Sequence, residues 1–306
     1  MSGRRRDWLL GALILGTLLA WVQVEIGWAA LLAPWRDLPP LQLAGLAALS
    51  ALSYLCRGAR LYVYFPRLAR GRLASVLRLS VLHNVANNLL PMRSGEAVFP
   101  LLMKRYFGHG YADSAFSLIW IRLLDLHAIG LLALAAAWLA RPHPGWWLAA
   151  LAWLLGLPLG YALRGPLARR VAAGSGRLGG LLRRVLAATP DAAGRLALVY
   201  LWTLATWGSK VVAFTAIVLH FIDAALWQAF LGVIGAELSS VLPFHGVAGT
   251  GSYELAMVAA LVPTGIDAAA ALAGAVNLHL FLLGVTLLLG LAALALPSGR
   301  ERSARS

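Results

Sequence analysis

Charged residues are scarce in this sequence, and acidic residues are especially scarce. Charged side chains make up 12% of the 306 residues, with 12 Asp and Glu against 26 Lys and Arg, whereas hydrophobic residues make up 60% and the mean hydropathy is +0.77. Soluble globular domains carry about 25% charged residues, so the composition excludes that class. It predicts an integral membrane protein.

The sequence has a single cysteine and none of several common catalytic motifs. Cys56 is the one cysteine, so no internal disulfide can form. The sequence contains no Walker loop, no GxSxG, no HExxH and no His, Cys and carboxylate spacing typical of a metal site. We therefore expect no metal and no cofactor.

Long apolar runs are abundant. Trp8–Leu32, Ala115–Ala140 and Leu196–Leu219 each reach the roughly 20 residues that cross a hydrocarbon core as a helix, and they are too long for the strands of a barrel. The first run follows three arginines but exceeds the length of a signal-peptide core, so we expect a retained span. The sequence predicts an all-α membrane protein.

Basic residues set the predicted orientation. The formal net charge of +14 could indicate a nucleic-acid partner, but most Lys and Arg lie in five clusters, at 4–6, 57–78, 104–105, 164–195 and after 299. Clusters on alternate sides of apolar spans are the positive-inside pattern. We expect no nucleic acid, both termini in the cytoplasm, and a bacterial inner (plasma) membrane location.

This pattern predicts six spans and two re-entrant helical hairpins. The spans are expected at about 8–31, 40–57, 112–139, 145–163, 196–219 and 267–296. The 57–78 connection is expected to form an interfacial helix pair broken at Pro66. The 164–195 segment is expected to be a linker with a short amphipathic helix near Leu181–Ala188.

The hairpins are interrupted apolar segments that resemble each other. Segment 79–103 has basic residues at both ends and is expected to enter from the cytoplasm, whereas 226–262 enters from outside. Asn87–Pro91 aligns with Ser239–Pro243, and each proline precedes a glycine-containing loop that ends in a glutamate. This predicts an inverted repeat in one membrane domain. The first half is 1–140. The second half begins at 141–163 and continues at 196–299, after the 164–195 linker.

The two interruptions predict a cavity inside the membrane. Broken helix is tolerated there only inside protein or beside water, because an unpaired backbone group costs several kcal/mol in lipid. Proline breaks the helix and glycine permits unusual backbone angles. The loop-forming residues are Pro91, Gly95, Pro243, Gly249 and Gly251. We expect the two loop tips to meet near the midplane.

Charged residues at membrane depth are the candidates for a head-group site. They are Arg93, Glu96, Arg122, Asp125 and Glu254. The two arginines could hold a phosphate, because a guanidinium offers paired hydrogen bonds, and the three carboxylates could balance them or carry protons. The alternative is that Arg122–Asp125 and Arg93–Glu96 are ion pairs that only hold helices together.

Other polar residues in apolar surroundings have two roles open. Asn84, Asn87 and Asn88 line the cavity or cap the helix break. Lys210 and Glu237 belong to the site or pair with each other, or Lys210 extends its side chain to the membrane interface. Asn277 and His279 line the site or make hydrogen bonds between helices.

Together these motifs resemble a known family. NxxNNLLPxRxGE at Asn84–Glu96, RLLDL at Arg122–Leu126 and LPxxGxxGxGxYE at Leu242–Glu254 are similar to the transmembrane region of lysylphosphatidylglycerol synthases, the flippase-like domain family. The resemblance implies movement of a phospholipid or a polyprenyl-phosphate-type lipid between leaflets. It implies roles for Pro91, Arg93, Gly95, Glu96, Arg122, Asp125, Pro243, Gly251 and Glu254.

The sequence departs from that family in two respects. The synthases add a large soluble aminoacyltransferase domain, so we expect a stand-alone member. Family members often carry an arginine in the last span, where this sequence has Asn277-Leu278-His279. This departure leaves open whether the head-group site is of the aminoacyl-lipid type.

Three functions remain open from the sequence. The first is a lipid flippase or transporter that binds lipids with an anionic head group. The second is a membrane enzyme that modifies a lipid head group, with Glu96 or Glu254 as base. The third is a non-catalytic partner that anchors envelope-synthesis proteins through its basic cytoplasmic loops. Besides membrane lipids, the partners we consider are a second copy of the chain and a lipid-synthesis enzyme.

Overall fold

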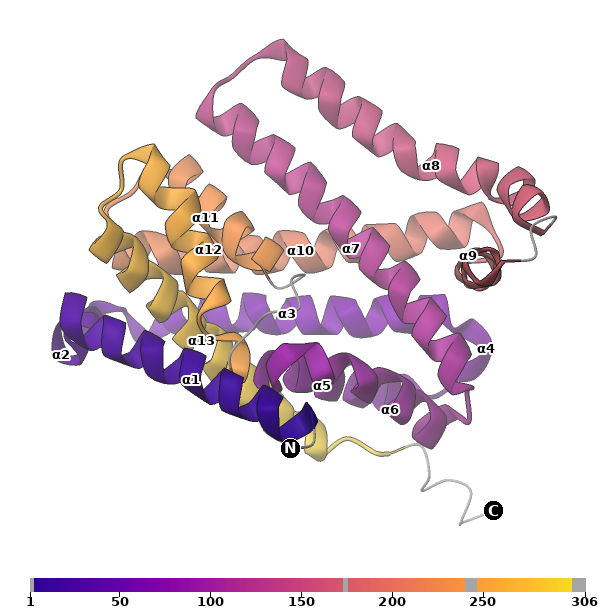
Figure 1. Cartoon of the computed structure of the whole chain (residues 1–306), viewed down its shortest axis with the longest axis horizontal. Helices are drawn as coiled ribbons and strands as arrows, with labels where there is room; N and C mark the ends of the chain where they lie inside the picture. The colour runs from indigo at the N-terminus through magenta and orange to yellow at the C-terminus, as the bar shows by residue number, and fades with distance from the viewer. Residues whose placement is uncertain (1–2, 173–175, 240–246, 299–306) are drawn as a thin grey trace. The chain divides into compact units, whose positions relative to one another are not determined.

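The computed structural model describes residues 3–172, 176–239 and 247–298, and every regular element in them is helical (Figure 1). The long helices are α1 (Gly3–Glu25), α3 (Pro40–Tyr64), α5 (Leu73–Leu89), α7 (Tyr111–Ala140), α8 (Pro144–Ala172), α10 (Ala193–Phe221) and α13 (Ala268–Leu294). The short ones are α2 (Trp28–Leu32), α4 (Pro66–Ala69), α6 (Val98–Phe107), α9 (Arg177–Ala187), α11 (Leu226–Ser239) and α12 (Ser252–Leu261). Four 3₁₀ segments are η1 (Ala33–Asp37), η2 (Pro91–Ala97), η3 (Val247–Gly249) and η4 (Val262–Thr264). The all-α prediction is confirmed.

Four helices in the described part of the chain are long and apolar enough to cross a membrane, namely α7, α8, α10 and α13. They coincide with the last four predicted spans. Helix α3, at the second predicted span, is long enough but does not reach the same apolarity. The count rises to five if the bent pair at the N-terminus is one broken span, so six spans stay a prediction.

The first predicted span is not one continuous helix. Helix α1 ends at Glu25, and the chain bends by 90° before Trp28–Asp37. Gly27 has a φ of 79°, and the amides of Ile26 and Gly27 both donate to the carbonyl of Val22. A glycine with positive φ directly after a helix is a common helix stop, because the side chains of other residues resist that angle.

Helix α8 extends further than expected. It continues to Ala172 through Pro158 and Pro166, so residues 164–172 are helical and the predicted linker begins later. None of its most apolar stretch is buried within the chain, and Trp147 and Leu148 are among its exposed side chains. Such a surface suits contact with lipid.

The other predicted breaks occur where expected. Helix α3 ends at Tyr64, and α4 begins at Pro66. Helix α9 is the amphipathic helix predicted near 181–188. Helix α5 ends at Leu89, and Leu90 is extended, with a ψ of 136°, because the residue before a proline is pushed out of the helical region.

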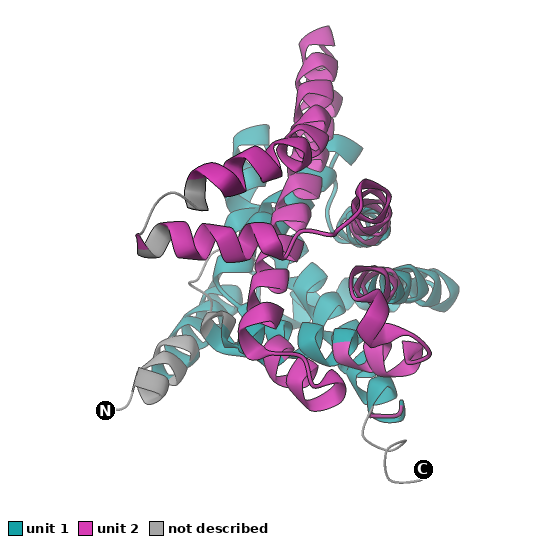
Figure 2. Ribbon diagram, turned by 90° about the vertical axis from the view of Figure 1, so that its right-hand side faces the viewer, with its two compact units in different colours: residues 1–55, 80–98, 208–296 teal, residues 56–79, 99–207, 297–306 magenta. Residues whose placement is uncertain are grey.

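The chain packs into two compact units, coloured separately in Figure 2. Unit 1 comprises residues 1–55, 80–98 and 208–296, and unit 2 comprises 56–79, 99–207 and 297–306. In unit 1, α12 packs against both α11 and α13; in unit 2, α7 packs against α8 and α9. Neither unit coincides with one half of the predicted repeat, and the repeat stays a prediction.

Candidate functional site

The two interrupted segments meet within unit 1. The 3₁₀ segments η2 and η3 are in contact, and α1 contacts both. The sequence predicted that the loop tips would meet near the midplane. The contact between η2 and η3 agrees with a meeting of the two segments, and their depth in the membrane stays a prediction. Each interruption is followed by a helix of 10 residues and then by a glycine with positive φ, Gly108 or Gly265.

Gly95 is required by close packing. A Cβ on this residue would lie 2.4 Å from the carbonyl carbon and oxygen of Ala86 and 2.5 Å from the amide nitrogen of Asn87. These are backbone atoms of α5, which cannot move aside. Segment η2 therefore folds back tightly onto the helix that precedes it.

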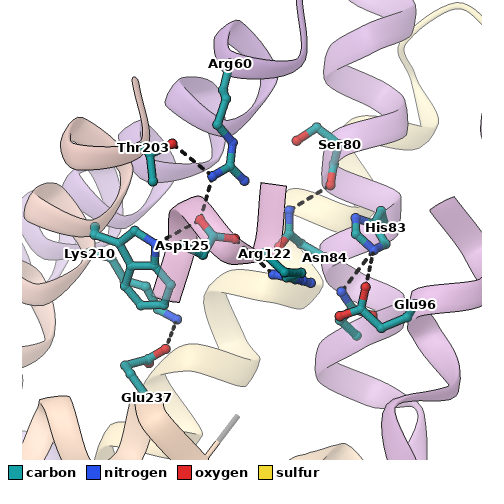
Figure 3. A network of polar contacts seen from close by, with 12 residues as sticks. Arg60, Ser80, His83, Asn84, Glu96, Arg122, Asp125, Thr203, Lys210 and Glu237 are labelled. Carbon is teal, nitrogen blue, oxygen red and sulfur yellow. Dashed lines mark hydrogen bonds and ion pairs between the residues drawn. The ribbon is translucent and has the colours of Figure 1, made fainter. Parts of the chain in front are cut away.

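The polar side chains around the first loop form a network on α5 (Figure 3). Glu96 Oε2 lies 3.5 Å from His83 Nε2, which also contacts the Asn87 amide nitrogen at 3.0 Å. Asn84 donates to the carbonyl of Ser80 at 2.8 Å, and Asn88 Nδ2 donates to Thr286 Oγ1 on α13 at 2.9 Å.

The described contacts of these asparagine side chains go to other side chains and to an earlier turn of α5. Cavity lining and capping of the helix break both stay predictions for them. Arg93 lies in η2, but its side chain is outside the described residues, and so is all of Pro243. The predicted Arg93–Glu96 pair is therefore neither supported nor contradicted.

The second loop is held by Glu254 and His279. Glu254 lies in the first turn of α12, where its Oε2 accepts the amide hydrogen of Gly251 at 2.7 Å. Its Oε1 lies 2.5 Å from Nδ1 of His279, and His279 Nε2 lies 2.9 Å from the carbonyl oxygen of Ala248. Both side chains are buried, with 1% and 4% exposed.

The backbone of this loop needs unusual angles. Ala248, Gly249 and Gly251 have φ values of 57°, 80° and 87°. A Cβ on Gly251 would also lie 2.4 Å from the side chain of Ile14 on α1. The predicted loop-forming role of the two glycines thus has a geometric basis, and Ala248 carries backbone strain that its neighbours must balance.

Two further polar groups in unit 1 are paired. Lys210 Nζ lies 2.6 Å from Glu237 Oε2, and Glu237 Oε1 accepts the hydroxyl hydrogen of Tyr253 at 3.1 Å. Asn277 accepts from Trp35 Nε1 at 2.7 Å and donates to the carbonyl of Leu31. The predicted pairing of Lys210 with Glu237 is therefore present. Asn277 makes the hydrogen bonds to other helical segments that were one of the roles open for it.

Unit 2 contains a buried cluster of arginines around one carboxylate (Figure 3). Asp125 Oδ1 lies 2.5 Å from Arg60 Nη1 and accepts from Trp207 Nε1 at 3.0 Å, while Oδ2 lies 3.2 Å from Arg122 Nη1. Arg57 lies over the ring of Trp207, 5.5 Å from its centroid. The predicted Arg122–Asp125 ion pair is present.

The charges of this cluster do not balance among these four ionisable groups. The three guanidinium groups face one carboxylate, and Arg57, Arg60 and Asp125 are less than 10% exposed. Arg122 is more accessible, with 30% of its side chain exposed. Guanidinium groups gathered in this way suit an anion, because each offers several hydrogen-bond donors and a permanent positive charge.

The sequence did not assign several of these residues to the site. Arg57 and Arg60 were predicted to belong to a cytoplasmic charge cluster, whereas both are buried on α3 and face Asp125 and Trp207. Their spacing of three residues, which places two side chains on one helix face, was the available signal. His83 and Trp207 had no comparable signal.

A separate cavity of about 390 Å³ lies in unit 2. Its lining includes Arg67 of α4, Arg184 of α9 and Arg195, together with Asp113 and Asp191. Arg195 is paired with Asp191 at 3.1 Å. In the described ranges, no three His, Cys, Asp or Glu side chains are grouped so that they could hold a metal ion.

The comparison with protein families agrees with this architecture. Residues 8–290 match the model of the Lysylphosphatidylglycerol synthase TM region. The chain belongs to this family. It is accordingly a membrane protein of the lysylphosphatidylglycerol synthase TM family, which is related to lipid biology, and the match spans both loops and the Asp125 cluster. Searches of curated proteins and of solved structures returned no match.

Proposed function

We propose that this protein is a transporter, not an enzyme, and that it moves a phospholipid or a polyprenyl-phosphate-type lipid between the leaflets of the bacterial inner membrane. The observation that carries the proposal is the group of three arginines around Asp125 and Trp207. A lipid phosphate would suit this group, because guanidinium groups bind phosphate oxygens through paired hydrogen bonds.

Arg122 is the group that best suits contact with the head group. Its side chain is 30% exposed, whereas Arg60 is buried against Asp125 at 2.5 Å. The phosphate would share Arg122 with Asp125, while Arg60 and Trp207 keep the carboxylate in place. The acyl or polyprenyl chains would stay in the bilayer throughout.

The two interrupted segments would provide the polar path. Broken helix within an apolar chain is stable only inside protein or beside water, and η2 and η3 are in contact. The sequence also predicts phosphate binding by Arg93, with Glu96 and Glu254 as the balancing carboxylates. The cavity with Arg67 and Arg184 would attract anionic head groups at the predicted cytoplasmic surface.

The proposal includes the finer topology predicted from the sequence. It places six spans and two opposed re-entrant hairpins in the membrane, with both termini in the cytoplasm. The partners are membrane lipids with an anionic head group, and a second copy of the chain or a lipid-synthesis enzyme.

The experiment is a leaflet-exchange assay on purified protein in liposomes. Fluorescent phosphatidylglycerol and a fluorescent polyprenyl phosphate are the probes, and a membrane-impermeant quencher reports the outer leaflet. We expect Arg122→Gln and Arg93→Ala to slow exchange by about tenfold or more, the effect of losing one charge-assisted hydrogen bond. Arg141→Gln is the matched control, because Arg141 is exposed beyond the end of α7.

Two results would contradict the proposal. The first is exchange of both probes no faster than in protein-free liposomes. The second is wild-type exchange rates in both Arg122→Gln and Arg93→Ala. A chemically altered probe recovered from the same liposomes would indicate an enzyme instead.

A further inference from the structure

Glu254 and His279 form a contact that requires a proton. The carbonyl oxygen of Ala248 can only accept a hydrogen bond, so His279 Nε2, 2.9 Å away, must carry a hydrogen. The amide of Gly251 occupies Oε2 of Glu254. One further hydrogen must then lie between His279 Nδ1 and Glu254 Oε1, because these two atoms are 2.5 Å apart and cannot approach as two acceptors.

This proton is the one that can leave. With it bound, the pair is either an imidazolium with a carboxylate or a neutral imidazole with a carboxylic acid, and both forms keep every contact. Without it, a carboxylate faces the lone pair of a neutral ring. Both side chains are at least 96% buried, so bulk solvent has little access to relieve that repulsion.

A second histidine shows that such a contact is not general. His127 on α7 also uses both ring nitrogens, with Nε2 2.8 Å from the carbonyl of Trp153 and Nδ1 2.6 Å from the hydroxyl of Tyr200. A tyrosine hydroxyl can donate, so neutral His127 satisfies both contacts. A carboxylate has no hydrogen to donate, and this distinguishes His279.

The nearest described charges belong to a second ion pair. From α12, the ring of Tyr253 lies 4.8 Å from the His279 ring, and its hydroxyl donates to Glu237 on α11. Glu237 is paired with Lys210 on α10. That pair is neutral by itself, so it does not replace the positive charge of the proton.

The remaining neighbouring elements carry several ionisable groups. Segment η2 carries Glu96 and also Arg93, whose side chain lies outside the described residues. The part of α5 in unit 1 carries His83, which contacts Glu96. On α1, among the side chains described, Glu25 is the titratable one, and α2 has none.

We propose that Glu254 and His279 form a proton-binding site that locks the second loop, and that release of the proton frees the loop. His279 bonds the carbonyl oxygen of Ala248, the residue with the strained backbone angle, and Glu254 bonds the amide of Gly251. The pair thus restrains both ends of residues 248–251. This loop begins in η3, which contacts η2. The proton is therefore the coupling ion of the transporter; this last step rests on the proposed function, whereas the proton site does not.

The first test measures the loop directly. Hydrogen–deuterium exchange of purified protein in lipid nanodiscs is followed for the peptide that contains 247–251, from about pH 5 to about pH 9, with correction for intrinsic exchange. We expect protection in the wild type to fall by about tenfold or more as pH rises, the effect of losing one hydrogen bond to a charged group.

Glu254→Gln is the decisive variant. A glutamine amide can donate to neutral His279 and accept from Gly251, so it imitates protonated Glu254 and has no proton to release. The loop should stay protected at every pH. His127→Gln is the matched control and should retain the pH dependence of the wild type. Wild-type protection that does not change with pH, or a pH dependence that persists in Glu254→Gln, would overturn the proton site.

The second test concerns coupling. In liposomes with fluorescent phosphatidylglycerol, an imposed pH gradient should change the exchange rate of the wild type several-fold and leave Glu254→Gln unaffected. Equal gradient dependence in both proteins would overturn the coupling. If neither protein moves lipid under any condition, the proposed function fails, and the exchange measurement still decides the proton site.

Discussion

Replacing Asp125 by asparagine tests whether the arginine cluster depends on its one carboxylate. The substitution keeps the shape of the side chain but removes the negative charge that faces Arg57, Arg60 and Arg122. If the amide oxygen continues to accept from Arg60 and Trp207, the amide nitrogen must face Arg122 Nη1, now 3.2 Å away, and two donors would oppose each other. The other orientation loses the two contacts at Oδ1.

The expected cost follows from burial. Removing one partner of a buried ion pair costs about 3–5 kcal/mol, mainly because the other charge is left uncompensated. Asp125 and Arg60 each have 4% of the side chain exposed, so solvent screening does not reduce this cost. We expect Asp125→Asn to lower the free energy of unfolding by that amount.

Equilibrium unfolding in mixed micelles, titrated with a denaturing detergent and followed by tryptophan fluorescence, measures this change. Asp113→Asn is the control, because Asp113 is an exposed carboxylate in the first turn of the same helix and should matter far less. Adding Arg60→Met to Asp125→Asn should recover part of the loss, since it removes an unpaired cation. A loss below about 1 kcal/mol, typical of an exposed ion pair, would refute the reasoning.

Substitutions at Gly95 and Lys210 test the packing of unit 1. Gly95→Ala should lower the free energy of unfolding by at least about 2 kcal/mol, because its methyl group would meet the backbone of α5. The control is Gly156→Ala in unit 2, which has open space around it and should be neutral or stabilising by up to about 1 kcal/mol. Lys210→Met should cost about 3–5 kcal/mol, and the double variant with Glu237→Gln should cost less than that, as a double-mutant cycle in the same assay would show. Equal losses in the two glycine variants, or additive losses in the cycle, would contradict these expectations.

Some buried contacts were predictable because charges at membrane depth are so few. Lys210 and Glu237 are far apart in the sequence, yet an unpaired charge in an apolar stretch is costly, and few partners were available for either. Arg122 and Asp125 are three residues apart on one helix, so their contact is local. Arg57 and Arg60 escaped the same reasoning because arginines near a span end also fit the positive-inside pattern.

The sequence alone determined the features that depend on nearby residues. The lengths of its apolar runs determined an all-helical membrane protein, and Pro66 and Pro91 determined two helix breaks, since proline acts on its own turn. Only the tertiary structure decided the rest. Packing brings η2 into contact with η3, buries Arg60 against Asp125 and joins Glu254 to His279. It also makes the close approach that requires glycine at position 95. No local sequence pattern encodes these contacts, because they join segments that are apart in the chain.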